Sequence, residues 1–167
     1  MTLKLIIARH AKSDWHAGSI TDHMRPLNGR GLRQASQLGE ELLKNTHRPS
    51  IIVSSDARRT EETALLMEPL FPNVHIQYDH RLYLGELSDI QHSVLTHAKH
   101  HKNVLILGHN PGFSVAASLL CRKSVELKTA CAAVLETTQT DWESAFIAKN
   151  FELIEVVEGR DSPQEPC

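Results

Sequence analysis

The amino-acid sequence predicts an α/β fold, in which helices cover both faces of a mostly parallel sheet as a three-layer α/β/α sandwich. Short aliphatic runs recur along the chain without a polar residue at every second position, which is typical of strands buried on both faces. Segments with apolar residues three and four positions apart lie between these runs. Strands that alternate with helices favour parallel pairing through right-handed crossovers.

Six strands are expected from these runs and from the apolar residues near the end of the chain. In chain order they cover residues 3–8, 51–53, 74–78, 104–107, 132–138 and 144–157, the last with a break at Asn150. Of the three strongest runs, only the first (LKLIIA) is interrupted, by Lys4. The strand at 74–78 follows the turn-forming pair Pro72-Asn73.

Four helices are expected between the strands. They cover about residues 32–43, 56–68, 88–100 and 113–120. In the first, Leu32, Ala35 and Leu38 repeat at intervals of three and form one apolar face. Pro69 ends the second, because proline disfavours the helical conformation of the residue before it. The fourth begins directly after Pro111-Gly112.

The length of 167 residues fits one domain, which we place at residues 1–158, with 159–167 (GRDSPQEPC) as a C-terminal tail. A chain of this size buries about 69% of its unfolded surface, enough for a core without disulfides or metal. The net charge of −2 argues against a strongly basic chain built to bind nucleic acid. The three cysteines form no CxxC pair, and no apolar stretch reaches 18 residues. We therefore expect a cytoplasmic protein without nucleic-acid or membrane partners.

Charged and imidazole side chains follow three of the expected strands. Arg9 and His10 come after the first strand, Arg58 and Arg59 after the second, and His109 after the third strong aliphatic run. Ligands of α/β sheets bind beyond the carboxyl ends of the strands, so these groups are expected to meet at one edge. Guanidinium groups match phosphate oxygens but repel a metal ion. The sequence therefore predicts phosphoryl transfer to a histidine, with no metal and no cofactor.

Four segments resemble motifs of the histidine phosphatase superfamily, in the order in which that family carries them. The segments are RHAKSDW (9–15), RPLNGRGLRQA (25–35), SSDARRTEETA (54–64) and GHNPG (108–112). The first is most similar to the small, SixA-like phosphohistidine phosphatases, and the resemblance implies a phosphoglycerate mutase-like fold. Three positions differ from the family pattern. Ala11 replaces a glycine, Asp56 replaces a common proline and could cap the following helix instead, and His16 stands where larger relatives often carry asparagine.

The resemblance also implies a role for each residue of the site. His10 is the nucleophile and forms a phosphohistidine intermediate that water hydrolyses. Arg9, Arg59 and His109 hold the phosphoryl oxygens, and Arg25 supplies a further phosphate contact. A phosphate or sulfate ion is expected among these groups. Because attack requires a neutral imidazole, activity is expected to fall in acid as His10 gains a proton.

The class of substrate depends on whether a general acid is present. An alkoxide leaves poorly without one, whereas the imidazole of a phosphohistidine leaves readily once it is protonated. The chain is too short for a large lid and has no obvious acid, which favours phosphohistidine on a protein as the substrate. Three alternatives stay open. They are a phosphatase of small phosphate monoesters with Glu86 as the acid (next Asp22 or Asp89), a phosphate-binding module without turnover, and a zinc-binding protein that uses His97 and His101.

Overall fold

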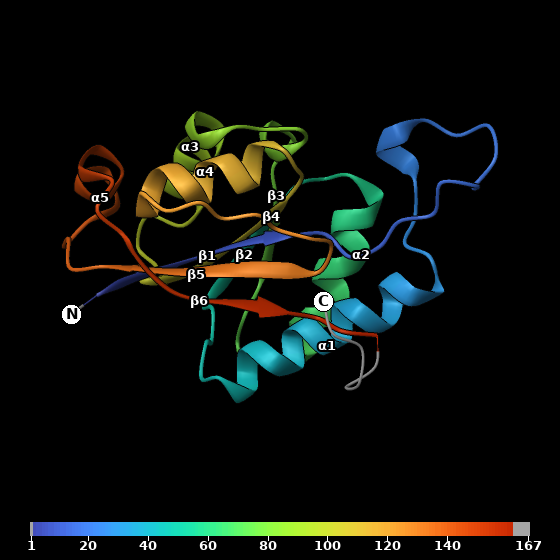
Figure 1. Ribbon diagram of the computed structural model, residues 1–167, viewed down its shortest axis with the longest axis horizontal. Helices are drawn as coiled ribbons and strands as arrows, with labels where there is room; N and C mark the ends of the chain where they lie inside the picture. The colour runs from blue at the N-terminus through green and yellow to red at the C-terminus, as the bar shows by residue number, and fades with distance from the viewer. Residues whose placement is uncertain (1, 162–167) are drawn as a thin grey trace.

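The computed structural model describes residues 2–161, which form a central sheet between two layers of helices (Figure 1). The sheet has six strands in the order β3-β2-β4-β1-β5-β6. The strands are β1 (Leu3–Arg9), β2 (Ile51–Ser54), β3 (Ile76–Tyr78), β4 (Asn103–Gly108), β5 (Cys131–Thr137) and β6 (Glu152–Glu158). β1 pairs parallel with β4, and β2 pairs parallel with β4 and β3, whereas β5 runs antiparallel between β1 and β6. The predicted three-layer α/β fold is confirmed, with a mixed sheet.

Helices cover both faces of the sheet, which explains why the strand sequences do not alternate (Figure 1). The helices are α1 (Gly29–Lys44), α2 (Arg58–Met67), α3 (Leu87–His97), α4 (Gly112–Cys121) and α5 (Trp142–Ala148). Leu5 and Ile7 of β1 pack in the core under α3, α4 and α5. Ile6 and Ala8 of the same strand pack on the other face, with α1 and α2. Each fully buried large aliphatic side chain contributes about 1.5–3 kcal/mol of transfer free energy.

The prediction of a strand at 144–157 is wrong for its first residues. Helix α5 extends to Ala148, and β6 begins only at Glu152. The Asp141 carboxylate accepts a hydrogen bond of 2.8 Å from the backbone N–H of Ser144, which is the N-cap contact that starts a helix. Trp142 and Phe146 lie four residues apart and bury their rings on the same side. The N-cap and the burial of two aromatic rings on one side of the helix therefore outweigh the aliphatic character of this segment.

The starts of α1 and α2 shape the loops beside the sheet edge. Gly31 of α1 packs directly on the backbone after β1, since a Cβ there would lie 2.0 Å from the carbonyl oxygen of Lys12. The expected cap of α2 by Asp56 is wrong, because Ala57 holds the N-cap position without a side-chain contact. The Asp56 carboxylate turns instead to the rings of His23 and His80.

The chain after β6 continues to pack on the domain for at least a few residues. Gly159 is buried, and its backbone N–H donates a 2.7 Å hydrogen bond to the Ala130 carbonyl. Asp161 pairs with Arg33 of α1. The rest of the expected tail, residues 162–167, lies outside the described residues, so the limits of the domain stay a prediction. Within residues 2–161, no helix combines the length and apolar character that crossing a bilayer requires.

The carboxyl ends of β1, β2 and β4 lie side by side at one edge of the sheet. The parallel register aligns Arg9 with Gly108, and Ser54 with Leu107. The residues that follow these strands, His10, Ser55 and His109, therefore leave the sheet close together. Three short 3-10 helices, η1 (Asp22–Met24), η2 (Glu68–Leu70) and η3 (His80–Leu82), lie in the connecting segments.

Candidate active site

Two histidines and an arginine from distant parts of the chain meet at this edge. The ring centroids of His10 and His109 are 5.3 Å apart. Arg59, in the first turn of α2, donates a hydrogen bond to each ring. All three side chains are nearly fully buried, with exposures of 6% for His10, 3% for Arg59 and 2% for His109. The structure therefore brings together three of the residues that the sequence predicts to share a site.

The partners of His10 define which ring nitrogen is free to react. Its Nδ1 lies 2.7 Å from the carbonyl oxygen of Ala11, and a carbonyl can only accept, so Nδ1 carries the hydrogen. Its Nε2 accepts from the Nε–H of Arg59 at 3.3 Å and therefore holds a lone pair. Burial lowers the pKa of His10 to about 3, and the charges of Arg59 and Arg9 act in the same direction, against the Ala11 carbonyl. His10 is thus a neutral imidazole at neutral pH.

His109 is held in a similar neutral state. Its Nε2 lies 2.9 Å from the Ser55 hydroxyl oxygen, and its Nδ1 accepts from the Nη2 of Arg59 at 3.2 Å. Burial, followed by the neighbouring His10 and Arg59, lowers the pKa of His109 to about 2. Two neutral imidazoles therefore face one buried guanidinium.

The Thr63 hydroxyl links Arg59 to the loop after β1 that carries His10. The hydroxyl donates to the Arg59 carbonyl oxygen at 2.7 Å, one helical turn earlier, and accepts from the backbone N–H of Ala11 at 3.2 Å. These two contacts hold the first turn of α2 against the loop after β1. They fix the position of the guanidinium relative to the ring of His10.

A cavity of about 370 Å³ opens beside these residues. It is lined by Arg9, His10, Lys12, Ser13, Trp15, Asp22, Arg25, Arg59, Leu84, His109, Asn110 and Thr129. Four of these side chains are cationic and one is a carboxylate, so the cavity favours an anion. A larger cavity, of about 750 Å³ between α1 and β6, has no histidine in its lining. Chemistry rather than size therefore identifies the site.

Arg25 and Arg9 complete the cationic wall. The Arg25 guanidinium lies 3.6 Å from the ring centroid of Trp15, and its Nη1 donates to the Ser13 hydroxyl at 3.0 Å. Arg9 donates from Nη1 to the Leu127 carbonyl at 3.2 Å. Its buried Nε–H has no acceptor among the described residues. An oxyanion in the cavity is a chemically suitable acceptor for such a donor.

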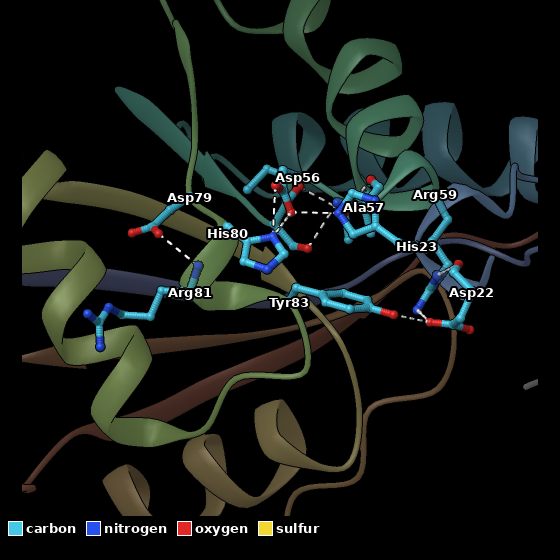
Figure 2. Close-up of polar contacts among 12 residues, drawn as sticks. Asp22, His23, Asp56, Ala57, Arg59, Asp79, His80, Arg81 and Tyr83 are labelled. Atoms are coloured by element: carbon cyan, nitrogen blue, oxygen red, sulfur yellow. Dashed lines mark hydrogen bonds and ion pairs between the residues drawn. The ribbon is translucent and has the colours of Figure 1, made fainter.

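The carboxyl group in the cavity belongs to Asp22, not to Glu86. The Asp22 carboxylate accepts from the Tyr83 hydroxyl at 2.5 Å and from Arg59 Nη2 at 3.2 Å (Figure 2). It also accepts from Arg25 Nε at 3.1 Å. These donors, Tyr83 first, lower the pKa of Asp22 to about 2, so the group is ionised at neutral pH. An ionised carboxylate has no proton to give to a leaving group.

Glu86 and Asp89 lie outside this cavity. Glu86 is exposed at the N-cap of α3, and its backbone N–H donates to the Asp89 carboxylate at 2.9 Å. The structure therefore does not bring Glu86, the acid of the monoesterase alternative, to His10. Arg58 is also outside: it is exposed and pairs with Glu62 at 2.9 Å.

The histidines considered as zinc ligands have different partners. His97 Nε2 lies 3.1 Å from the Asp79 carboxylate, whereas His101 Nδ1 lies 2.9 Å from the Ser50 hydroxyl. Across the described part of the chain, these two rings do not belong to any group of three potential metal ligands. The structure thus gives no support to a zinc site at this pair.

Leu84 and Thr129 of the cavity lining, and the neighbouring Tyr83, belong to no motif or candidate site named from the sequence. Tyr83, Leu84 and Thr129 lie in loops, and their approach to the site depends on how those loops fold back over the sheet edge. Tyr83 holds Asp22, and its ring lies 5.5 Å from that of His109 in an edge-on arrangement. The whole arrangement can bind a tetrahedral oxyanion against a neutral, buried nitrogen nucleophile.

Comparison with known proteins places the same residues in a family context. The model of the histidine phosphatase superfamily (branch 1) matches residues 5–103, a range that includes His10, Arg25 and Arg59 but ends before His109. An uncharacterized chloroplastic protein of Arabidopsis thaliana is 33% identical over 153 residues, covering 86% of this chain and 70% of that protein.

Solved structures share the fold over nearly the whole chain. A candidate phosphohistidine phosphatase SixA from Nakamurella multipartitia has a TM-score of 0.78 at 26% identity, covering 93% of this chain and 95% of that one. The protein histidine phosphatase SixA complexed with tungstate has a TM-score of 0.77 at 16% identity, covering 94% and 97%. The second likeness shows the fold alone.

Proposed function

Because the chain belongs to the histidine phosphatase superfamily, we propose that it hydrolyses phosphohistidine on a protein through a covalent phosphohistidine intermediate at His10. The observation that carries the proposal is the unprotonated Nε2 of His10, buried beside a cavity with four cationic side chains. In this assignment His10, Arg9, Arg59 and His109 are catalytic, and Arg25 binds the phosphoryl group. No metal or cofactor enters the reaction.

The first step transfers the phosphoryl group to the enzyme. The Nε2 lone pair of His10 forms a bond to phosphorus while the phosphorus–nitrogen bond of the substrate breaks. The electron pair of the broken bond stays on the departing imidazole, which leaves as a neutral ring if it arrives protonated. Arg59 and Arg9 stabilise the charge on the phosphoryl oxygens, and removal of one such donor typically costs about 100- to 1,000-fold in rate.

The second step returns the enzyme to its starting state. Water adds to phosphorus as the bond to His10 Nε2 breaks, and the water proton is released to solvent, leaving inorganic phosphate. The Nδ1–H of His10 remains bonded to the Ala11 carbonyl throughout, so the ring keeps its orientation. His109, anchored by the Ser55 hydroxyl, accepts from Arg59 at Nδ1 and so helps to hold the guanidinium in place.

The proposed substrate class rests on the lack of a protonated carboxyl group among the residues that line the cavity. An ester substrate needs a proton for its alkoxide, but Asp22 is ionised and Glu86 lies outside the cavity. Phosphohistidine needs no such acid once its own imidazole is protonated. The exposed Trp15 and the half-exposed Asp22 at the cavity suit a substrate presented on a protein surface.

The test compares two classes of substrate on the same preparation. A phosphohistidine-containing phosphotransfer domain and a panel of sugar phosphates are assayed with the wild type, His10→Ala and Glu86→Gln. We expect turnover of the phosphohistidine protein, loss of that turnover in His10→Ala, and no change in Glu86→Gln. Efficient sugar-phosphate hydrolysis that collapses in Glu86→Gln would replace the proposal by the monoesterase alternative.

Trapping the intermediate separates an enzyme from a phosphate-binding module. After a brief reaction with radiolabelled phosphohistidine protein, acid-labile and alkali-stable label is expected on His10. Binding of phosphorylated partners without any label on His10 would support the module without turnover.

A further inference from the structure

Two histidines and an aspartate form a compact group beside Tyr83, outside the lining of the phosphate cavity (Figure 2). His23 Nε2 lies 2.8 Å from Asp56 Oδ1, and His80 Nδ1 lies 2.9 Å from Asp56 Oδ2. The ligand atoms of the three side chains all lie within 4.8 Å of one another. In residues 2–161 this is the one group of three histidine, cysteine or acidic side chains with such close spacing.

We propose that His23, Asp56 and His80 form a site for a divalent late first-row transition metal ion, with zinc as the ion to test. Imidazole nitrogens suit zinc and its neighbours in the series, and a carboxylate oxygen completes a mixed nitrogen and oxygen set. Calcium and magnesium are disfavoured, because they prefer all-oxygen ligands. The proposal is independent of the proposed phosphatase function.

The distances between the ligand atoms fit this use after a small adjustment. Tetrahedral zinc with bonds of about 2.0–2.1 Å separates its ligand atoms by about 3.3 Å. The contacts from His23 and His80 to Asp56 Oδ1, of 2.8 and 3.0 Å, would widen by a few tenths of an ångström as the ion replaces the hydrogen bonds. The two ring nitrogens lie within 4.8 Å of each other and would approach to reach the same ion. Water can occupy the fourth position.

The fold prepares the three side chains and leaves them accessible. They come from η1, the β2–α2 loop and η3, which are distant in sequence but fixed around the end of the sheet. The ring of Tyr83 packs edge-on to His23 at 4.9 Å and lies 5.8 Å from His80, which orients both imidazoles. His80 is 72% exposed and Asp56 35%, so an ion can enter from solvent without unfolding.

The group of His23, Asp56 and His80 also differs from the phosphate cavity in the sign of its charge. Asp56 supplies the negative charge that a cation requires, whereas the cationic side chains of the cavity are not among its ligands. The guanidinium carbon of Arg59 lies 6.0 Å from the Tyr83 centroid, and the same ring packs edge-on to His23. The anion site and the proposed cation site thus both border Tyr83.

A bound ion would tie η1 to the start of α2 and to η3. His23 directly follows Asp22, whose carboxylate contacts Arg59 and Arg25 in the cavity. The ion would therefore restrict the segment that carries Asp22. The unfolded chain does not hold the three ligands together, so the ion binds the folded state in preference. Binding of the ion therefore raises the free energy of unfolding.

The experiment measures zinc binding to the full chain after removal of metal with a chelator. Zinc alone is titrated in competition with a chromophoric indicator, for the wild type, His80→Ala, His23→Ala and the control His97→Ala. The control also removes an imidazole paired with a carboxylate, since His97 bonds to Asp79, but that pair lacks a second imidazole. Thermal unfolding with and without zinc is recorded for each protein.

We expect one zinc ion per wild-type chain and a rise in melting temperature on adding zinc. His80→Ala and His23→Ala should weaken zinc binding at least about tenfold and remove most of that rise, whereas His97→Ala should match the wild type. The exposed position of His80 makes His80→Ala the variant that retains the fold. The proposal is overturned if zinc does not bind, if both variants bind zinc as tightly as the wild type, or if His97→Ala loses as much affinity as His80→Ala.

Discussion

Acidification is expected to destabilise the fold through His10, because the folded protein holds this imidazole neutral. Burial, with the charges of Arg59 and Arg9, lowers its pKa from 6.5 to about 3. In the unfolded chain the imidazole returns to an ordinary pKa of about 6.5. Above that pH the imidazole is neutral in both the folded and the unfolded state, so its titration does not lower the free energy of unfolding. As the pH falls from about 6.5 toward 3, only the unfolded state gains the proton, so the free energy of unfolding falls.

The size of this loss of unfolding free energy follows from the difference between the solution pH and the pKa of the unfolded imidazole. At about pH 5 the solution is about 1.5 units below the pKa of the unfolded imidazole, and each unit corresponds to about 1.4 kcal/mol, which gives a loss of about 2 kcal/mol. The imidazole of the folded protein is neutral at this pH for any pKa of about 4 or less. The loss of unfolding free energy therefore depends little on the pKa of His10 in the folded protein. His109, with a pKa of about 2, adds a similar loss by the same reasoning.

Urea unfolding at about pH 7.5 and pH 5 measures the effect in the wild type and in His10→Gln. The wild type should lose about 2 kcal/mol more than the variant between the two pH values, because the variant lacks the titrating ring. Nitrogen chemical shifts of the His10 ring provide an independent measurement. Equal losses in the two proteins, or a protonated His10 ring in the folded protein at pH 5, would show that the reasoning is wrong.

Four further outcomes are expected. His10→Ala should abolish turnover while tungstate still binds through the arginines, as calorimetry can show; loss of both would point to a structural role for the ring. Arg59→Met should lower kcat/KM about 100- to 1,000-fold and raise the pKa of His10, and an unchanged NMR titration would contradict the contact. Asp22→Asn should tighten phosphate binding about fivefold, since the half-exposed carboxylate no longer pairs with Arg59 and Arg25; weaker binding would argue against this competition. Trp142→Ala should cost about 3–5 kcal/mol of unfolding free energy, measured in urea, without changing kcat; a loss below about 1 kcal/mol would contradict its packing in the core.

The position of the cavity could be predicted from the sequence because parallel strands end at a common edge. His10 and His109 directly follow strand ends, and Arg59 lies in the first turn of the helix after β2. Aliphatic runs in the sequence mark these strand ends clearly. Arg25 was expected from its motif and lies in the cavity wall. The catalytic roles of these residues remain a proposal that the variants above test.

Features built by loops could not be predicted in the same way. Asp22 reaches the cavity because η1 folds over the start of α2, and nothing in the local sequence separates it from Glu86 as the carboxyl of the site. The ligands of the proposed metal site are 33 and 24 residues apart, spacings that match no short motif. The N-cap at Asp141 was available as a signal, but a helix as short as α5 shows little periodicity.

The hydrogen bond from His10 to the Ala11 carbonyl has a consequence for the chemical identity of the intermediate. It commits the ring to a single tautomer and orientation, so only one of two constitutional isomers of the phosphorylated side chain can form, the one substituted at Nε2. Access to the other isomer would require the ring to flip inside a closely packed site. The protein is thus expected to be regioselective for its own modification, whatever mixture of isomers its substrates carry.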